Sequence, residues 1–229
     1  RPRNNPVILP VSEGAFTVPR LDMWGIVKIV SKSTVSYGKY ALENGFSGIT
    51  LGTRPAPADK AVQSGNSFTV FSSGYGLNAG TIGDTKGTQD NVSFIYKNTS
   101  DAISGSYEVT ATIEKNDGTG GIMIRKNPAS NAEFAALALK KDGTLSLAQR
   151  NMPDKEAIWQ EIGFVSLPIT LKLVYSKEKI TAFQSKNGAD FIKVSEISLS
   201  LPQAVSGGFG SGGTVKFSSI AAENVNLNG

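Results

Sequence analysis

The stretch 118–150 (GTGGIMIRKNPASNAEFAALALKKDGTLSLAQR) holds the residues best suited to binding a polar ligand. Period-two alternation in its first strand places the isoleucines on one face and Met123 and Arg125 on the other. Arg150 ends a second alternating run, so two guanidinium groups are expected on the same non-core face. Because arginine carries a rigid fork of donors, it can bridge two neighbouring oxygens of a sugar or a carboxylate.

Further residues complete a candidate sugar-binding site if they share one sheet face with the arginines. Trp159 offers an aromatic surface for the C–H face of a sugar ring. Asn131 and Glu133 lie in the loop region KNPASNAE after Arg125, and loops often carry binding residues. The candidate ligand-binding residues are Arg125, Arg150, Trp159, Asn131, Glu133, Lys172, Tyr175 and Gln184. The alternative stays open that the arginines are solvated or ion-paired strand residues and Trp159 a core residue.

The composition removes several classes of catalysis. The 229 residues include no histidine and no cysteine, which excludes Ser-His and Cys-His pairs, thiol chemistry and disulfides. A glycosidase needs two carboxylates at a set separation. Single glutamates are present, but not in the Glu-x-Asp-x-x-Glu strand pattern of jelly-roll glycosidases. We therefore expect a protein that is not an enzyme, although an Arg/Tyr or Lys base remains chemically possible.

The charge pattern also narrows the range of partners. The 23 basic and 19 acidic residues give a formal net charge of +4, and the basic residues are scattered. Nucleic-acid binding usually needs a concentrated basic stripe, so no nucleic-acid partner is expected. Apolar runs such as 24–30 fall far short of the roughly 20 residues that span a bilayer, so no membrane partner is expected either. Because the chain opens on Arg-Pro-Arg without Met, we expect a piece of a longer protein.

Short alternating segments at spacings near ten residues, separated by turn signals such as Asp142-Gly143, indicate an all-β fold, an antiparallel β-sandwich. The segment 131–141 is rich in helix formers, but the neighbouring hairpins favour a strand. The glycine-rich stretch 207–213 lacks the Lys-Ser/Thr of a phosphate loop, so we expect a flexible connection between strands. Strands are expected at 24–30, 34–42, 67–71, 91–96, 106–114, 121–125, 132–139, 144–150, 158–165, 169–175, 179–184, 191–195, 204–208 and 214–219.

Several stretches follow one another in a familiar order: FSGITLG, SFTVFSSGYGL, TQDNVSFIYKNTSDAISGSYEVTATI, GGIMIR, AEFAALALKKDGTLSLAQR, LPITLKLVYSKEKITAFQSKNGADF and AVSGGFGSGGTVKFSSIAAENVNL. In these the chain resembles the concanavalin-like jelly-roll modules of bacterial polysaccharide-degrading enzymes, including carbohydrate-binding family 66. The resemblance covers 46–229 as one sandwich and leaves 1–45 as an N-terminal extension or additional edge strands. The chain departs from the family pattern at Gln89-Asp90, at Phe191 where a tryptophan is common, and at Tyr175 where an arginine is frequent.

The resemblance implies a non-catalytic carbohydrate-binding module that brings an attached, secreted bacterial depolymerase to a polysaccharide such as pectin or fructan. A structural spacer that packs against the catalytic module is the alternative, and a jelly-roll lyase or hydrolase is a weaker one. No cofactor is required. Jelly-roll modules often carry a calcium ion at a loop junction, so a structural calcium is possible. The loop aspartates that could supply oxygen ligands are Asp84, Asp90, Asp101 and Asp117.

Overall fold

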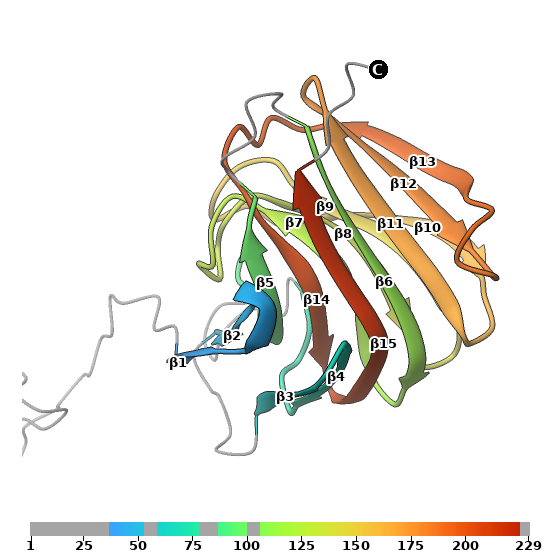
Figure 1. The fold of residues 1–229 in the computed structure, drawn as a ribbon. Helices are drawn as coiled ribbons and strands as arrows, with labels where there is room; N and C mark the ends of the chain where they lie inside the picture. The colour runs from blue at the N-terminus through green and yellow to red at the C-terminus, as the bar shows by residue number, and fades with distance from the viewer. Residues whose placement is uncertain (1–36, 53–58, 78–86, 100–105, 225–229) are drawn as a thin grey trace, which may run out of the picture. The chain divides into compact units, whose positions relative to one another are not determined.

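The computed structural model describes residues 37–52, 59–77, 87–99 and 106–224, and these form two antiparallel sheets (Figure 1). The eight-stranded sheet has the order β1-β2-β5-β14-β7-β8-β9-β10, and the seven-stranded sheet has the order β13-β12-β11-β6-β15-β4-β3. The strands are β1 (Tyr37–Ala41), β2 (Ser47–Leu51), β3 (Lys60–Ser64), β4 (Ser67–Ser72), β5 (Val92–Asn98), β6 (Tyr107–Asn116), β7 (Thr119–Arg125), β8 (Phe134–Lys140), β9 (Thr144–Arg150), β10 (Ile158–Phe164), β11 (Ile169–Ser176), β12 (Lys179–Ser185), β13 (Ile192–Ser198), β14 (Val205–Ser211) and β15 (Gly213–Asn224). A short 3-10 helix, η1 (Glu43–Gly45), joins β1 to β2.

The main core lies between the two sheets. Alternate residues of each strand point inward, so Ile122 and Leu137 of the eight-stranded sheet pack in one cluster with Leu171 of the seven-stranded sheet. Within the eight-stranded sheet, Ile122 pairs with Leu137, and Leu137 pairs with Leu147 of β9. The alternation therefore fixes which face of each strand meets the other sheet.

The central strands of the eight-stranded sheet are buried on their outer face as well. Met123, Phe134 and Ala136 belong to a second buried cluster together with Phe209 of β14. A strand that is buried on both faces has an almost continuous apolar sequence rather than an alternating one. This explains why FAALALK of β8 has the composition of a helix yet forms a strand, as predicted.

The structure also differs from the strand predictions. The stretch 207–213 is not a flexible connection, because most of it forms β14, which pairs with β5 on one side and β7 on the other. Strands β2 and β3 were not among the predicted strands, and both lie towards the end of a sheet. The predicted strand 24–30 lies outside the described residues. Strand β1 pairs with β2 and forms one edge of the eight-stranded sheet.

We expect Gly207→Ala to lower the free energy of unfolding by about 3 kcal/mol, the upper range for overpacking a core. A Cβ atom at Gly207 would lie 1.8 Å from the carbonyl oxygen of Ile95 on β5, so the two strands would have to separate. Urea denaturation measures the effect. The matched control is Ser206→Ala, since the buried Ser206 hydroxyl has no hydrogen-bond partner in the described chain. Equal stability of the two variants would contradict the close approach.

Glu196 of β13 is expected to titrate with a midpoint near pH 2. Its carboxylate accepts hydrogen bonds from Lys193 (2.8 Å) and Lys179 (3.3 Å), and these bonds lower its pKa from 4.5 to about 2. Because the folded-state pKa is depressed, the stabilisation is present above pH 4.5 and is lost as pH falls towards 2. Carbon-13 NMR titration measures the midpoint, and Lys193→Met should raise it. A midpoint that does not respond to this substitution would refute the assignment.

No helix in the described part of the chain has the length and apolar character needed to cross a membrane.

Candidate functional site

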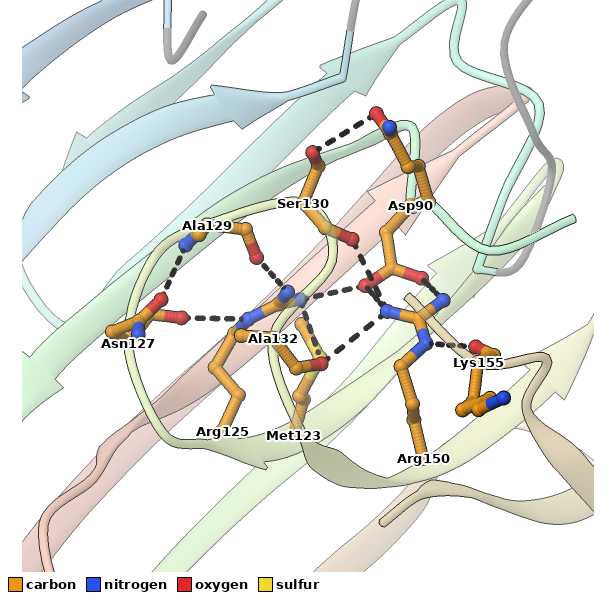
Figure 2. A network of polar contacts seen from close by, with 10 residues as sticks. Asp90, Met123, Arg125, Asn127, Ala129, Ser130, Ala132, Arg150 and Lys155 are labelled. Carbon is orange, nitrogen blue, oxygen red and sulfur yellow. Dashed lines mark hydrogen bonds and ion pairs between the residues drawn. The ribbon is translucent and has the colours of Figure 1, made fainter. Parts of the chain in front are cut away.

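The two arginines of the predicted site meet at a single carboxylate (Figure 2). Arg125 Nη1 lies 3.0 Å from Asp90 Oδ2, and Arg150 contacts Asp90 with two nitrogens, at 2.9 Å and 3.1 Å. All three side chains have no exposed surface. Both arginines face the outer side of the eight-stranded sheet, as predicted, because each pairs with Phe134 on the strand between them. The Phe134 ring lies 5.8 Å and 5.0 Å from the two guanidinium carbons.

Backbone carbonyls accept further hydrogen bonds from both guanidinium groups. Arg125 donates to the carbonyls of Asn127 and Ala129, both in the loop between β7 and β8. Arg150 donates to the carbonyls of Ser130 and Ala132 in the same loop, and to the carbonyl of Lys155 in the loop between β9 and β10. We name this group of Asp90, Arg125 and Arg150 the arginine clasp. It holds two loops and the segment before β5 against the end of the sheet (Figure 2).

The arginine clasp is a structural element in this conformation. Burial lowers the pKa of Arg125, while the charge of Asp90 acts in the opposite direction, and an arginine stays protonated under such shifts. Because neither guanidinium group has exposed surface, neither is in position to touch a sugar. The observed contacts correspond to the ion-paired alternative for the arginines.

Asn131 and Glu133 lie in the β7–β8 loop, and Trp159 lies on β10 of the same eight-stranded sheet. Asn131 donates to Asp154 Oδ1 at 3.0 Å, which joins the β7–β8 loop to the β9–β10 loop. Glu133 accepts from Lys126 Nζ at 2.7 Å. Trp159 pairs with Ala148 at the edge of the outer face and is 40% exposed, so it is not a fully buried core residue.

The last three candidates lie on the seven-stranded sheet and do not share one face. Lys172 is on its outer face, where its ammonium group lies 4.1 Å from the centre of the Phe191 ring and 3.9 Å from Glu108. Tyr175 points into the core, and its hydroxyl accepts from the backbone N–H of Leu201. Gln184 pairs with Leu171 and therefore lies on the core side. The eight candidates thus do not form one surface, because their strands belong to two different sheets. The sequence alone does not say which sheet each strand joins.

The aspartates considered for calcium do not form a cluster of free oxygen ligands in the described chain. Asp90 lies between two arginines, and Asp117 lies 2.7 Å from Lys115 Nζ. Asp84 and Asp101 lie outside the described residues. Among the described residues no group of three or more His, Cys, Asp or Glu side chains is placed to hold a metal ion. The structural calcium stays a prediction, because two of its four candidate aspartates lie outside the described residues.

An open cleft of about 780 Å³ lies at the other end of the strands. Tyr75 forms one wall and is 74% exposed, which is unusual for an aromatic side chain. The rest of the lining comes from the β6–β7, β8–β9 and β14–β15 turns, which the antiparallel pairing brings to the same end. The residues that line the cleft are Gly74, Tyr75, Asp117, Gly118, Thr119, Lys140, Lys141, Asp142, Ser211 and Gly212. We name it the Tyr75 cleft.

Both carboxylates of the Tyr75 cleft are already engaged. Asp117 Oδ2 lies 2.7 Å from Lys115 Nζ. Asp142 Oδ1 accepts from the backbone N–H of Thr144 at 2.9 Å, and this hydrogen bond is the main reason that the pKa of Asp142 is lowered. A general acid needs a raised pKa, so the shift of Asp142 is opposite to what acid catalysis requires.

The Tyr75 cleft was not predicted from the sequence. The pattern Gly74-Tyr75-Gly76 places an aromatic residue between glycines directly after a strand, and the Asp142-Gly143 turn was identified as a hairpin. Each signal is local. Nothing in the sequence says that these turns and Tyr75 meet at one end of the sandwich.

Comparison with solved structures finds the same fold at low sequence identity. A family 66 carbohydrate-binding module from Bacillus subtilis is 14% identical, with a TM-score of 0.52, over 79% of this chain and 96% of that one. A functionally unknown protein from Saccharomyces cerevisiae is 13% identical, with a TM-score of 0.54, over 72% of this chain and 92% of that one. A family 43 glycoside hydrolase from Bacillus licheniformis is 11% identical, with a TM-score of 0.55, over 81% of this chain and 38% of that one.

These matches confirm the predicted class, an all-β antiparallel sandwich of the concanavalin-like type. The chain spans well under half of the length of the glycoside hydrolase that it matches. No protein-family model matches the chain, and no curated protein matches its sequence. At these identities the likeness concerns the fold, so function has to be argued from the site.

Proposed function

We propose that this chain is a non-catalytic carbohydrate-binding module whose sugar site is the Tyr75 cleft. The observation that carries the proposal is an exposed tyrosine ring on the wall of an open cleft that is otherwise lined by polar side chains and glycine backbone. A sugar ring presents an apolar C–H face and a rim of hydroxyl groups, so it needs one aromatic surface and several donors and acceptors. The cleft offers both, and its volume of about 780 Å³ lies in the range typical of ligand sites.

The chemistry of the cleft favours binding over bond cleavage. Hydrolysis of a glycosidic bond needs one carboxyl group with a raised pKa and a second carboxylate. Asp142 has a lowered pKa, and Asp117 is paired with Lys115. The fold similarity to a carbohydrate-binding module supports the same reading at the level of architecture.

The biological role that follows is to bring an attached enzyme to its substrate. A site of modest affinity raises the local concentration of a linked, secreted depolymerase on a polysaccharide such as pectin or fructan. The module itself supplies contact and orientation, and the partner domain supplies the reaction.

Isothermal titration calorimetry against pectin, fructan and xylan oligosaccharides tests the proposal. We expect binding of at least one glycan without release of reducing ends or unsaturated products. No binding to any of the glycans would refute the carbohydrate-binding function. Product formation by the chain alone would instead support a lyase or hydrolase.

The second candidate is a spacer domain that packs against a catalytic module, and the exposed edge of β10 favours it. Ile158 is 56% exposed and Phe164 is 76% exposed on this strand, and no other described strand lies beyond it in its sheet. Such apolar surface is common where two domains meet. Absence of glycan binding together with protection of this edge in the full-length parent protein would favour the spacer role.

A further inference from the structure

In the Tyr75 cleft the carboxylates have partners within the protein, whereas two lysines have none in the described part of the chain. Lys115 pairs with Asp117, and the Thr144 backbone N–H bonds Asp142, so each carboxylate has a partner from the protein. Lys140 and Lys141 also line the cleft, and both are exposed. Neither ammonium group makes an ion pair or a hydrogen bond within the described part of the chain. The positive charge of Lys140 helps to lower the pKa of Asp142 without direct contact. The groups of the cleft that remain available for a charged ligand are therefore cationic.

The distance between these lysines and Tyr75 determines how long a ligand must be to contact both. Gly212 approaches Gly74 beside Tyr75, and Gly212 directly follows β14, whereas Lys140 ends β8. Strand β7 lies between β14 and β8, so the two sides are separated by two strand spacings, roughly 10 Å. A ligand that stacks on Tyr75 reaches the lysines with a neighbouring sugar unit rather than with the same ring.

We propose that the Tyr75 cleft selects saccharides that carry negative charge, as the carboxylate of a uronic acid or as a sulfate ester. This inference rests on the proposed carbohydrate-binding function and names its substrate class. The ring of Tyr75 stacks on the apolar face of one sugar unit. Lys140 and Lys141 attract the anionic group of the neighbouring sugar unit. Exposed lysines are flexible point charges, so they favour an anion without demanding one geometry.

Matched pairs of probes test the inference. The first pair is an oligogalacturonate and its methyl ester, which differ only in the charge of the carboxyl groups. The second pair is a sulfated galacto-oligosaccharide and its desulfated form. We expect the charged member of at least one pair to bind about tenfold more tightly in low salt, since exposed ion pairs are individually weak and two lysines act together. The preference should shrink strongly at high salt, where screening acts over a few ångströms.

The variant Lys140→Gln/Lys141→Gln should remove the charge preference and keep the affinity for the neutral member of each pair. The control Lys155→Gln/Lys177→Gln removes two exposed lysines at the opposite end of the strands and should leave the preference unchanged. Circular dichroism confirms that both variants are folded.

Three other outcomes are distinguishable. Equal binding of the charged and neutral probes, lost in Tyr75→Ala, would overturn the anionic selectivity and leave the carbohydrate-binding function standing. A charge preference that survives in the Lys140→Gln/Lys141→Gln variant would overturn the assignment to these lysines. No binding of any probe by the wild-type chain would overturn both the selectivity and the proposed function.

Discussion

Replacing Asp90 with asparagine is expected to lower the free energy of unfolding by about 3–5 kcal/mol, the cost of removing one partner from a buried ion pair. The substitution keeps the shape of the side chain and removes its charge. Arg125 and Arg150 would then be two guanidinium groups of like charge with no exposed surface and no carboxylate between them. Urea denaturation followed by circular dichroism measures the change.

Asp154→Asn is the matched control for this prediction. Asp154 lies in the neighbouring β9–β10 loop and accepts a hydrogen bond from Asn131, but it is exposed. Its loss should cost well under 1 kcal/mol because exposed polar pairs are worth little. Similar losses in the two variants would show that the arginine clasp does not depend on the Asp90 charge. A clasp of purely structural role also predicts that glycan affinity changes little in any Asp90 variant that remains folded.

Tyr75→Ala is expected to weaken glycan binding by about 30-fold, which corresponds to the 2 kcal/mol that marks a binding hot spot. Among the described residues, the tyrosine is the one strongly exposed aromatic residue that lines the cleft. Removing the ring removes the stacking surface but should leave the fold intact, because the side chain is 74% exposed. Isothermal titration with the best glycan of the panel measures the loss.

Two further variants make this prediction specific. Tyr75→Phe keeps the ring and should retain most of the affinity. Trp159→Ala removes an exposed aromatic residue at the β10 edge that the sequence predicted as a sugar contact, and it should leave binding unchanged. If Trp159→Ala abolished binding and Tyr75→Ala did not, the sugar site would lie near β10, and the Tyr75 cleft would be excluded.

Most strands could be predicted from the sequence because the signals that define them act over a few residues. Alternation placed Arg125 and Arg150 on one face, and the Asp142-Gly143 turn fixed the β8–β9 hairpin. Strand β14 was predicted only in part, as 204–208, because the glycines in its second half carry no hydrophobic pattern. Glycine is required at 207 because a Cβ atom there would collide with the backbone of β5. Strand β5 is far from β14 in the sequence, so no local signal marks this contact.

The candidate site was harder to predict than the fold. Residue type predicts that Lys172, Tyr175 and Gln184 join the arginines in one site, yet they lie on the other sheet and on two different faces of it. Side-chain chemistry alone does not state which sheet a strand joins. The sequence allows an ion-paired role for the arginines, but it does not identify Asp90 among the aspartates as their partner.

The sequence by itself determined the class of this protein: an all-β sandwich without histidine or cysteine chemistry, whose strands and turns follow from local backbone preferences. Only the tertiary structure decided what the polar residues do. Burial of Arg125 and Arg150 around Asp90 turned the predicted ligand contacts into a structural clasp. The meeting of Tyr75 with three turns at the opposite end created the cleft. The physical reason is that alternation and turn chemistry depend on residues close together in the sequence. Ion pairing and cleft formation depend on strands that are far apart in the sequence and meet only in the folded structure.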